Sequence, residues 1–421
     1  MNKISANNLF KWIVFASIAS LTGLLITFCF VTLIKEILIY TNKNTYTFFL
    51  LPLSAPILCK FLAYHYSPES AEEGVLSYLK SVNSSFGDLP FKVTFFKFVA
   101  CLITLGCNLS GGVVGPLVRV NSGLASFLSK QKLPRRFQLN QDDRRTFVIC
   151  GAAATVATVF HAPLSSGLFA VEILKRANMR YLDLFPSILT ACLTTALAKG
   201  LGLPAVFPFH STNVTFPIKD LIWIVLIGFA SGYFSILYVN FYHWVSKTSE
   251  RKRLRFGSKL IGASLVTLIA FIFSHELLGT SQTILEDLLN GKVPHLPSMF
   301  QNYNAVFLGI ILLAFLKGIT NCLTVGTGFS AGFAGPSVIM GMLIGVSFGH
   351  ALGAIPLSGS YYGFLAAGMS GVLSASMNVP MAAAAMGAEL FGSSIGFSST
   401  IASIVAFQVA RSATLYKSQL N

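Results

Sequence analysis

Apolar residues are arranged along this chain in long windows that short polar stretches separate. A helix needs about 20 consecutive apolar residues to cross the hydrocarbon core of a bilayer. The pattern therefore predicts an all-α integral membrane protein whose helices lie near Lys11–Ile34, Tyr46–Tyr64, Thr94–Leu109, Phe147–Leu174, Ile188–Gly202, Leu221–Trp244, Leu260–Leu278, Val306–Val325, Phe333–Leu352, Tyr362–Leu390 and Ile395–Ala410.

Several of these windows are short or are interrupted by glycine and proline, so we expect tilted, paired and partial helices. The first window has a full-length apolar core and no obvious small-residue cleavage site, which favours a retained helix over a signal peptide. Composition agrees with a membrane protein, because 54% of the residues are hydrophobic, 11% are charged and the mean hydropathy is +0.69.

Basic residues outnumber acidic ones by 30 to 15 and gather in three short loops: KQKLPRRF, LKRANMR and KTSERKRLRF. The positive-inside rule places such loops in the cytoplasm. A further attraction of anions to the cytoplasmic mouth is the alternative interpretation of this charge. No soluble basic domain with interleaved aromatic residues is present, which argues against a nucleic-acid partner.

The chain contains a weak internal duplication. Gly112–Pro116 (GVVGP) matches Gly332–Pro336 (GFAGP) at an offset of 220 residues, and Gly151–Glu172 matches Gly368–Glu389 at an offset of 217. We expect one transmembrane domain over residues 1–421, with a first repeat at about 45–200 and a second at about 215–410. Paired segments interrupted by Gly and Pro indicate a substrate site near mid-membrane, commonly between inverted repeats.

The two GxxGP segments suggest helices that begin inside the membrane. The backbone N–H groups at such a beginning have no partner within the helix and carry partial positive charge, so they attract an anion. Several such ends and hydroxyl donors must converge, because one end stabilises an anion by only about 0.3–2 kcal/mol. Close helix packing is the alternative, and we prefer it for the alanine- and glycine-rich segments at 151–172 and 368–389.

Three segments in this order resemble the CLC family of chloride channels and chloride/proton antiporters: GGVVGPLVRVNSG, CGAAATVATVFHAPLSSGLFAVEIL and GFAGPSVIMGMLIGVSFG. They are similar to the family's GREGP motif, its GAAAGxAAxFxAP segment and its GxFxP motif. The resemblance covers roughly residues 60 to 420. It implies a fold of inverted repeats built from tilted and broken helices, and a homodimer in which each subunit has its own anion pathway.

Two departures from the family pattern concern proton movement. The family's external gating glutamate corresponds to Val114, and its internal proton-transfer glutamate corresponds to Ile173. Proton coupling needs titratable groups along a path, and neither side chain titrates. We therefore expect a passive channel for chloride or similar small monovalent anions, with Val114 at the gate position.

Residue-by-residue correspondence with the family motifs gives a set of expected anion-binding residues. The tyrosine of the family's C-terminal segment corresponds to Tyr416, for which an interfacial aromatic anchor is the alternative. The family's central serine is assigned to Ser67, whose alternative role is to cap a helix that contains Glu72 and Glu73. Ala334 replaces a phenylalanine, which predicts a wider pathway there. The set comprises Ser67, Gly112, Val113, Val114, Gly115, Phe333, Ala334, Gly335 and Tyr416.

Four further polar residues lie in apolar surroundings. Glu172 and Glu389 stand at matching positions of the two copies, which favours a structural role at helix ends over a functional one. His161, before Ala162-Pro163, is interpreted as the end of a helix rather than a proton carrier. Lys317 is expected to snorkel or to pair near a helix end.

Two other functions remain open. One is a chloride/proton antiporter with a substitute carboxylate such as Glu69, Glu72 or Glu73, and the other is a non-conducting structural membrane protein. An enzyme is not expected, since no HExxH, GxSxG or pair of membrane aspartates occurs. The seven cysteines stand singly, which indicates neither a metal site nor disulfides.

The expected substrate is a chloride ion, and we expect no cofactor. Membrane lipid and a second copy of the chain are the expected partners, and the cell membrane is the expected location. No nucleotide-binding module and no cytoplasmic regulatory domain are expected, since the sequence has no segment for them after Asn421.

Overall fold

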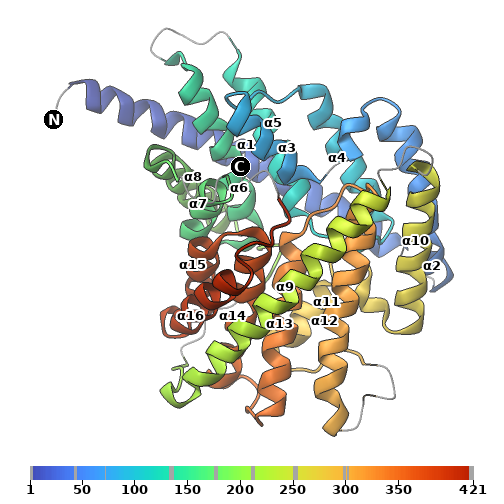
Figure 1. The fold of residues 1–421 in the computed structure, drawn as a ribbon. Coiled ribbons are helices and arrows are strands. Elements are labelled where there is room, and N and C mark those ends of the chain that lie inside the picture. The colour runs from blue at the N-terminus through green and yellow to red at the C-terminus, as the bar shows by residue number, and fades with distance from the viewer. Residues whose placement is uncertain are drawn as a thin grey trace.

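The computed structural model describes residues 3–41, 45–71, 73–131, 137–174, 179–209, 214–249, 255–296, 300 and 303–416. Regular structure in these ranges is helical, as the apolar windows predict (Figure 1). The α-helices of the first half are α1 (Lys3–Thr41), α2 (Thr45–Cys59), α3 (Gly74–Ser84), α4 (Phe91–Gly106), α5 (Val114–Ser129), α6 (Gln141–Phe160), α7 (Pro163–Glu172) and α8 (Tyr181–Gly200).

The second half is built in the same way. Its helices are α9 (Leu221–Ser249), α10 (Arg255–Ile272), α11 (Gln282–Leu289), α12 (Tyr303–Gly326), α13 (Ala334–Ala351), α14 (Gly359–Met377), α15 (Pro380–Phe391) and α16 (Ser393–Val409). Short helical turns connect some of them: a π-helix at Lys60–Tyr64 and 3-10 turns at Pro68–Ala71, Ile218–Asp220 and His275–Leu277.

Helix length and hydropathy identify five candidate membrane spans in the described residues: Asn8–Thr41, Tyr181–Gly200, Ile218–Ser249, Ala305–Gly326 and Ala334–Ala351. Shorter apolar helices occupy Phe48–Tyr64, Phe256–Ile272 and Ser393–Val409. Partial helices therefore accompany full-length ones, as the interrupted windows predict.

Two long apolar windows are each divided into two helices. The window at 147–174 breaks at His161, which ends α6 with φ of 54°, and the window at 362–390 breaks at Asn378, which ends α14 with φ of 57°. Positive φ is uncommon outside glycine, and asparagine and histidine adopt it more readily than most residues. Pro163 and Pro380 then begin α7 and α15. The interpretation of His161 as a helix end is confirmed.

The matched segments of the two halves form matching helices. α5 packs on α6 as α13 packs on α14, α6 packs on α8 as α14 packs on α16, and α7 contacts α15. α5 begins at Val114 and α13 at Ala334, which preserves the 220-residue offset of the sequence match. The repeat boundaries themselves remain a prediction.

Small residues allow the helices of each half to approach closely. A Cβ on Gly341 would lie 2.7 Å from the Gly368 carbonyl carbon, and one on Gly151 would lie 2.7 Å from the Asn121 oxygen. Real Cβ atoms do not approach other atoms so closely, so these helices are in backbone contact. The packing interpretation of the segments at 151–172 and 368–389 is confirmed.

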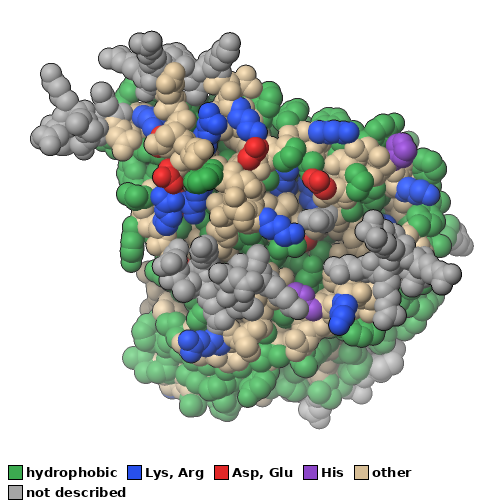
Figure 2. Space-filling view, turned by 45° about the horizontal axis from the view of Figure 1, so that its top comes forward, with side chains coloured by type: hydrophobic (Ala, Val, Ile, Leu, Met, Phe, Trp, Pro, Cys, Tyr) green, Lys and Arg blue, Asp and Glu red, His purple; other side chains and the backbone are tan. Residues whose placement is uncertain are grey.

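Most of the basic loop residues lie outside the described residues, so the cytoplasmic orientation of the three loops remains a prediction. Lys and Arg side chains nevertheless gather on one face, between bands of hydrophobic side chains (Figure 2). Among the described residues, Lys11 pairs with Asp143, Lys130 with Asp88, and Arg180 with Asp142.

Candidate functional site

The two GxxGP segments meet inside the protein. The Gly112 amide donates to the Gly332 carbonyl at 2.9 Å, and the Gly332 amide donates back to the Gly112 carbonyl at 2.8 Å. This antiparallel bridge joins the residues that lead into α5 and α13. The two helix N-termini therefore lie side by side, although 220 residues separate their first residues.

Both helices begin without a side-chain cap. Val113 and Phe333 occupy the N-cap positions, and neither side chain accepts a hydrogen bond from its helix. The first N–H groups of a helix have no intrahelical acceptor, and a glycine and a proline follow in each first turn. The N–H groups of Val114, Gly115, Ala334 and Gly335 are thus available for a ligand or for water.

Glycine at these positions is a packing requirement. A Cβ on Gly332 would lie 2.7 Å from the Gly115 nitrogen, and a Cβ on Gly112 would lie 2.8 Å from Cδ of Pro336. Neither position has room for a side chain while the bridge persists. The glycines of the two motifs therefore determine how closely the helix ends approach.

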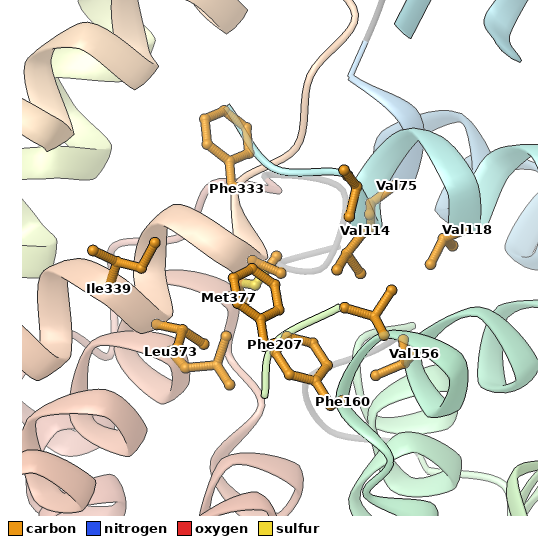
Figure 3. Packing of buried hydrophobic residues seen from close by; sticks show 14 of the residues in the cluster. Val75, Val114, Val118, Val156, Phe160, Phe207, Phe333, Ile339, Leu373 and Met377 are labelled. Atoms are coloured by element: carbon orange, nitrogen blue, oxygen red, sulfur yellow. The ribbon is translucent and has the colours of Figure 1, made fainter. Parts of the chain in front are cut away.

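An apolar cluster surrounds the helix ends on one side. Val114 and Phe333 are both 0% exposed, and Figure 3 shows them in the same buried cluster as Phe207. The Phe207 ring stacks on Phe160 with centroids 5.2 Å apart, and its tip lies 3.1 Å from where a Cβ on Gly335 would stand. Phe207 therefore packs beside Gly335 in the first turn of α13. The wider pathway expected at Ala334 remains a prediction.

The structure brings Tyr416 to the same place. Its side chain is 1% exposed, and its ring lies edge-on to Phe333 with centroids 6.5 Å apart. The described end of the chain is held here because the Leu415 amide donates to the Ser376 carbonyl at 3.1 Å. Tyr416 is therefore a buried neighbour of the α13 N-terminus, which does not fit the alternative of an interfacial anchor.

Ser67 does not reach the helix ends through any contact described for it. Its amide donates to the Ala63 carbonyl, and its own carbonyl accepts from Ser70, so its hydrogen bonds are local. It does not cap α3 either, because that helix begins at Gly74 with Glu73 as its N-cap. The capping interpretation of Ser67 is wrong for this helix, and its role as an anion ligand has no contact in its favour.

Glu73, rather than Ser67, has contacts near the start of α5. Its carboxylate accepts a hydrogen bond from the Tyr416 hydroxyl at 3.2 Å and another from the Leu76 amide at 3.0 Å. A Cβ on Gly115 would overlap the Glu73 carboxylate, so this carboxylate lies against the first turn of α5. Gly74, the next residue, allows α3 to touch the Gly115 and Pro116 backbone, a tertiary contact that the sequence alone does not indicate.

Two polar side chains on α12 contact the loops that lead into the site, and only Lys317 of these was singled out from sequence. Asn321 donates to the Gly332 carbonyl at 3.3 Å and accepts from the Tyr238 hydroxyl at 2.5 Å. Lys317 is 0% exposed and donates to the Ser110 hydroxyl at 2.8 Å. Of the two expectations for Lys317, snorkelling is wrong because its side-chain nitrogen is buried, and the nitrogen instead bonds to Ser110 and to the carbonyl of Leu277 at the end of a 3-10 turn.

Ile173 is 1% exposed and ends α7. Its neighbours Val171 and Leu174 line a cavity of about 530 Å³. The charged side chains of Arg145 and Asp183 line the same cavity. These two form a buried ion pair, and Thr146 donates to Asp183 at 2.7 Å. Position 173 itself thus supplies no titratable group to this cavity.

Comparison with known proteins agrees with this architecture. A family model described as voltage gated chloride channel matches residues 55–411. An uncharacterized protein of Methanocaldococcus jannaschii is 25% identical over 97% of this chain and 95% of its own length. A chloride/fluoride channel protein of Pseudomonas syringae is 24% identical over 97% of this chain and 86% of its own length.

Solved structures show the same fold. A CLC-type fluoride/proton antiporter superposes with a TM-score of 0.82 at 18% identity, covering 100% of this chain and 99% of the other. A slow cyanobacterial Cl⁻/H⁺ antiporter gives 0.79 at 17% identity, covering 96% and 94%. With the family match over most of its length and with the paired helix ends at Gly112 and Gly332, the chain belongs to the voltage gated chloride channel (CLC) family, whose members are anion channels and transporters.

Proposed function

We propose that this protein moves chloride or a similar small monovalent anion across a membrane by way of the first turns of α5 and α13. The observation that carries the proposal is the bridge between Gly112 and Gly332. It brings together two uncapped helix ends, whose N–H groups and partial positive charge replace part of the water shell of an anion.

The buried hydroxyl of Tyr416 and the first-turn amides of both helices are the groups that we expect to bind the anion. No single helix end suffices, because dehydrating a small ion in a low-dielectric interior costs on the order of tens of kcal/mol. The buried side-chain nitrogen of Lys317 donates to Ser110 and so helps to hold the same loop in place. Fluoride is a further candidate substrate, since related proteins carry names that include it.

We propose passive conduction as the mode of transport. Val114 and Ile173 stand where the family has its two proton-carrying glutamates, and neither side chain binds a proton. Coupled anion/proton exchange is the second candidate, favoured by one observation: Glu73 places a buried carboxylate against Tyr416 and Gly115. We further expect two copies to associate in the cell membrane.

Reconstituted vesicles test both modes. With a chloride gradient and a pH-sensitive dye, we expect anion efflux that brings no uphill proton movement. Proton movement against its gradient, driven by chloride, would replace the passive proposal with the exchanger. If well-folded protein carries neither chloride nor fluoride, the remaining alternative is a non-conducting structural membrane protein.

A further inference from the structure

The carboxylate of Glu73 lies where three elements meet. α3 contributes Glu73 as its N-cap, α5 contributes Gly115, and the described C-terminal segment contributes Tyr416. Glu73 is 5% exposed, and both of its carboxylate oxygens accept a hydrogen bond. A charged side chain is rarely buried so completely unless its partners compensate for the lost hydration.

The partners of this carboxylate are of the kind that an anion would use. Leu76 offers a first-turn amide of α3, Tyr416 offers a hydroxyl, and the N-terminal turn of α5 lies directly beside the carboxylate. Helix N-termini stabilise carboxylates and free anions in the same way. Glu73 therefore uses donors that an anion beside Tyr416 would also need.

The charged and titratable groups facing Glu73 come from several elements. Lys97 on α4 is buried and donates to the Ser70 carbonyl at 3.2 Å. Its positive charge attracts the carboxylate of Glu73. Two neutral hydroxyl groups also face the Glu73 carboxylate: that of Tyr416, in the C-terminal segment, and that of Tyr238, on α9. Lys97 and the Tyr416 donor both favour the ionised form of Glu73, which opposes the effect of burial.

We propose that Glu73 is a proton-controlled gate, whose ionised carboxylate holds the place of the anion beside Tyr416 and whose protonated form yields it. This inference rests on the proposed anion pathway through the same helix ends. Two negative charges at hydrogen-bonding distance from one hydroxyl repel each other strongly in a water-poor interior. Protonation removes the charge of Glu73 and releases the Tyr416 hydroxyl to donate to the incoming anion.

Anion flux at equal pH on both sides of the vesicle tests the gate. We expect wild-type flux to rise as pH falls from about 8 to about 5, a range within which buried carboxyl groups titrate. Above the midpoint the change approaches tenfold per pH unit, since the protonated fraction falls by that factor. Glu73→Gln removes the charge at every pH, so its flux should be high and nearly independent of pH.

Glu69→Gln is the matched control, because Glu69 is an exposed carboxylate four residues earlier in the same segment. It should keep the wild-type pH profile. A pH profile of Glu73→Gln that equals that of the wild type would overturn the gate and leave the anion pathway intact. No flux from the wild type and both variants, all well folded, would instead overturn the proposed function.

A second measurement needs no variant and applies even if Glu73→Gln does not fold. Calorimetric titration of the wild type with chloride, in two buffers of different ionisation enthalpy, reports protons taken up on binding. By linkage we expect uptake approaching about one proton per chloride above the midpoint pH. Chloride binding with no proton uptake between about pH 5 and 8 would contradict the gate.

Discussion

Glu172 and Glu389 hold the first turns of each other's helices. Glu172, at the end of α7, accepts from the amides of Met381 and Ala382 of α15 at 2.9 and 2.7 Å. Glu389, near the end of α15, accepts from the amides of Leu164 and Ser165 of α7 at 2.7 and 2.8 Å. The exchange joins the two halves and bears out the structural role expected for this pair.

Glu172→Gln should destabilise the protein. A charged acceptor at a helix N-terminus forms stronger bonds than an amide, so we expect a loss of about 1–3 kcal/mol in the free energy of unfolding. Glu389→Gln should lose somewhat less, since Glu389 is half-buried and Glu172 is 8% exposed. Thermal unfolding in detergent measures both, with Glu69→Gln as the exposed control. Unchanged midpoints would mean that these caps contribute nothing to stability.

Gly332→Ala should separate the two helix ends. Its Cβ would lie 2.7 Å from the Gly115 nitrogen, and such overpacking costs about 1–3 kcal/mol. Anion flux should fall with stability, because the first-turn amides no longer converge. Gly200→Ala is the control, since a Cβ there meets nothing within 4 Å. A variant with wild-type flux and stability would be inconsistent with the glycine bridge as the centre of the pathway.

Much of this architecture could be predicted from sequence because its cause is local. Gly followed by Pro at two matching positions is sufficient to predict helix starts, and Pro163 and Pro380 mark the starts of α7 and α15. The two matched GxxGP segments were expected to converge, and the bridge between Gly112 and Gly332 brings them together. Tyr416 was identified by the resemblance, and the structure places it beside Phe333.

The rest depends on tertiary contacts that no local pattern records. Glu73 was one of three substitute carboxylates, and only the packing of Gly74 on Gly115 singles it out. Phe207 lies between α8 and α9, where no motif indicates that its ring covers Gly335. Lys317 has the same sequence signature as a snorkelling lysine, and its burial depends on the loop at Ser110.

Lys317→Met should cost on the order of 3 kcal/mol in unfolding free energy, because charged hydrogen bonds are lost and buried acceptors remain unpaired. Its ammonium group donates to Ser110 at 2.8 Å, to the Leu277 carbonyl at 3.2 Å and to the Gly279 carbonyl at 3.1 Å. Anion flux should also decrease, because the loop that leads to Gly112 loses the donor that holds it at Ser110. Lys219→Met, at an exposed lysine, is the control for both measurements. Equal stability of the two variants would show that these buried contacts are dispensable.

Val114→Glu should create a block that depends on pH. In a Glu73→Gln background, a carboxylate at the start of α5 could occupy the place of the anion when ionised, so flux should fall as pH rises. Val114→Gln is the control of equal size without charge, and it should show no such slope. Flux that is the same from about pH 4 to 8 in the glutamate variant would mean that Val114 does not border the pathway.

Tyr416→Phe should move the pH profile of anion flux to higher pH. The Tyr416 hydroxyl donates to the ionised carboxylate of Glu73 at 3.2 Å, so its removal disfavours that form and lets Glu73 take up a proton more readily. A hydrogen bond to a charged group contributes about 1.5–3 kcal/mol, which corresponds to a shift of about one to two pH units.

The direction of this shift separates the gate from a simple loss of an anion ligand. Losing a ligand lowers chloride affinity at every pH without moving the midpoint, whereas losing the carboxylate partner moves the midpoint upward. Tyr361→Phe is the control, because Tyr361 is also buried but its hydroxyl donates to the Leu288 carbonyl. A Tyr416→Phe midpoint that is unchanged or lower would disprove the link between Tyr416 and the charge of Glu73.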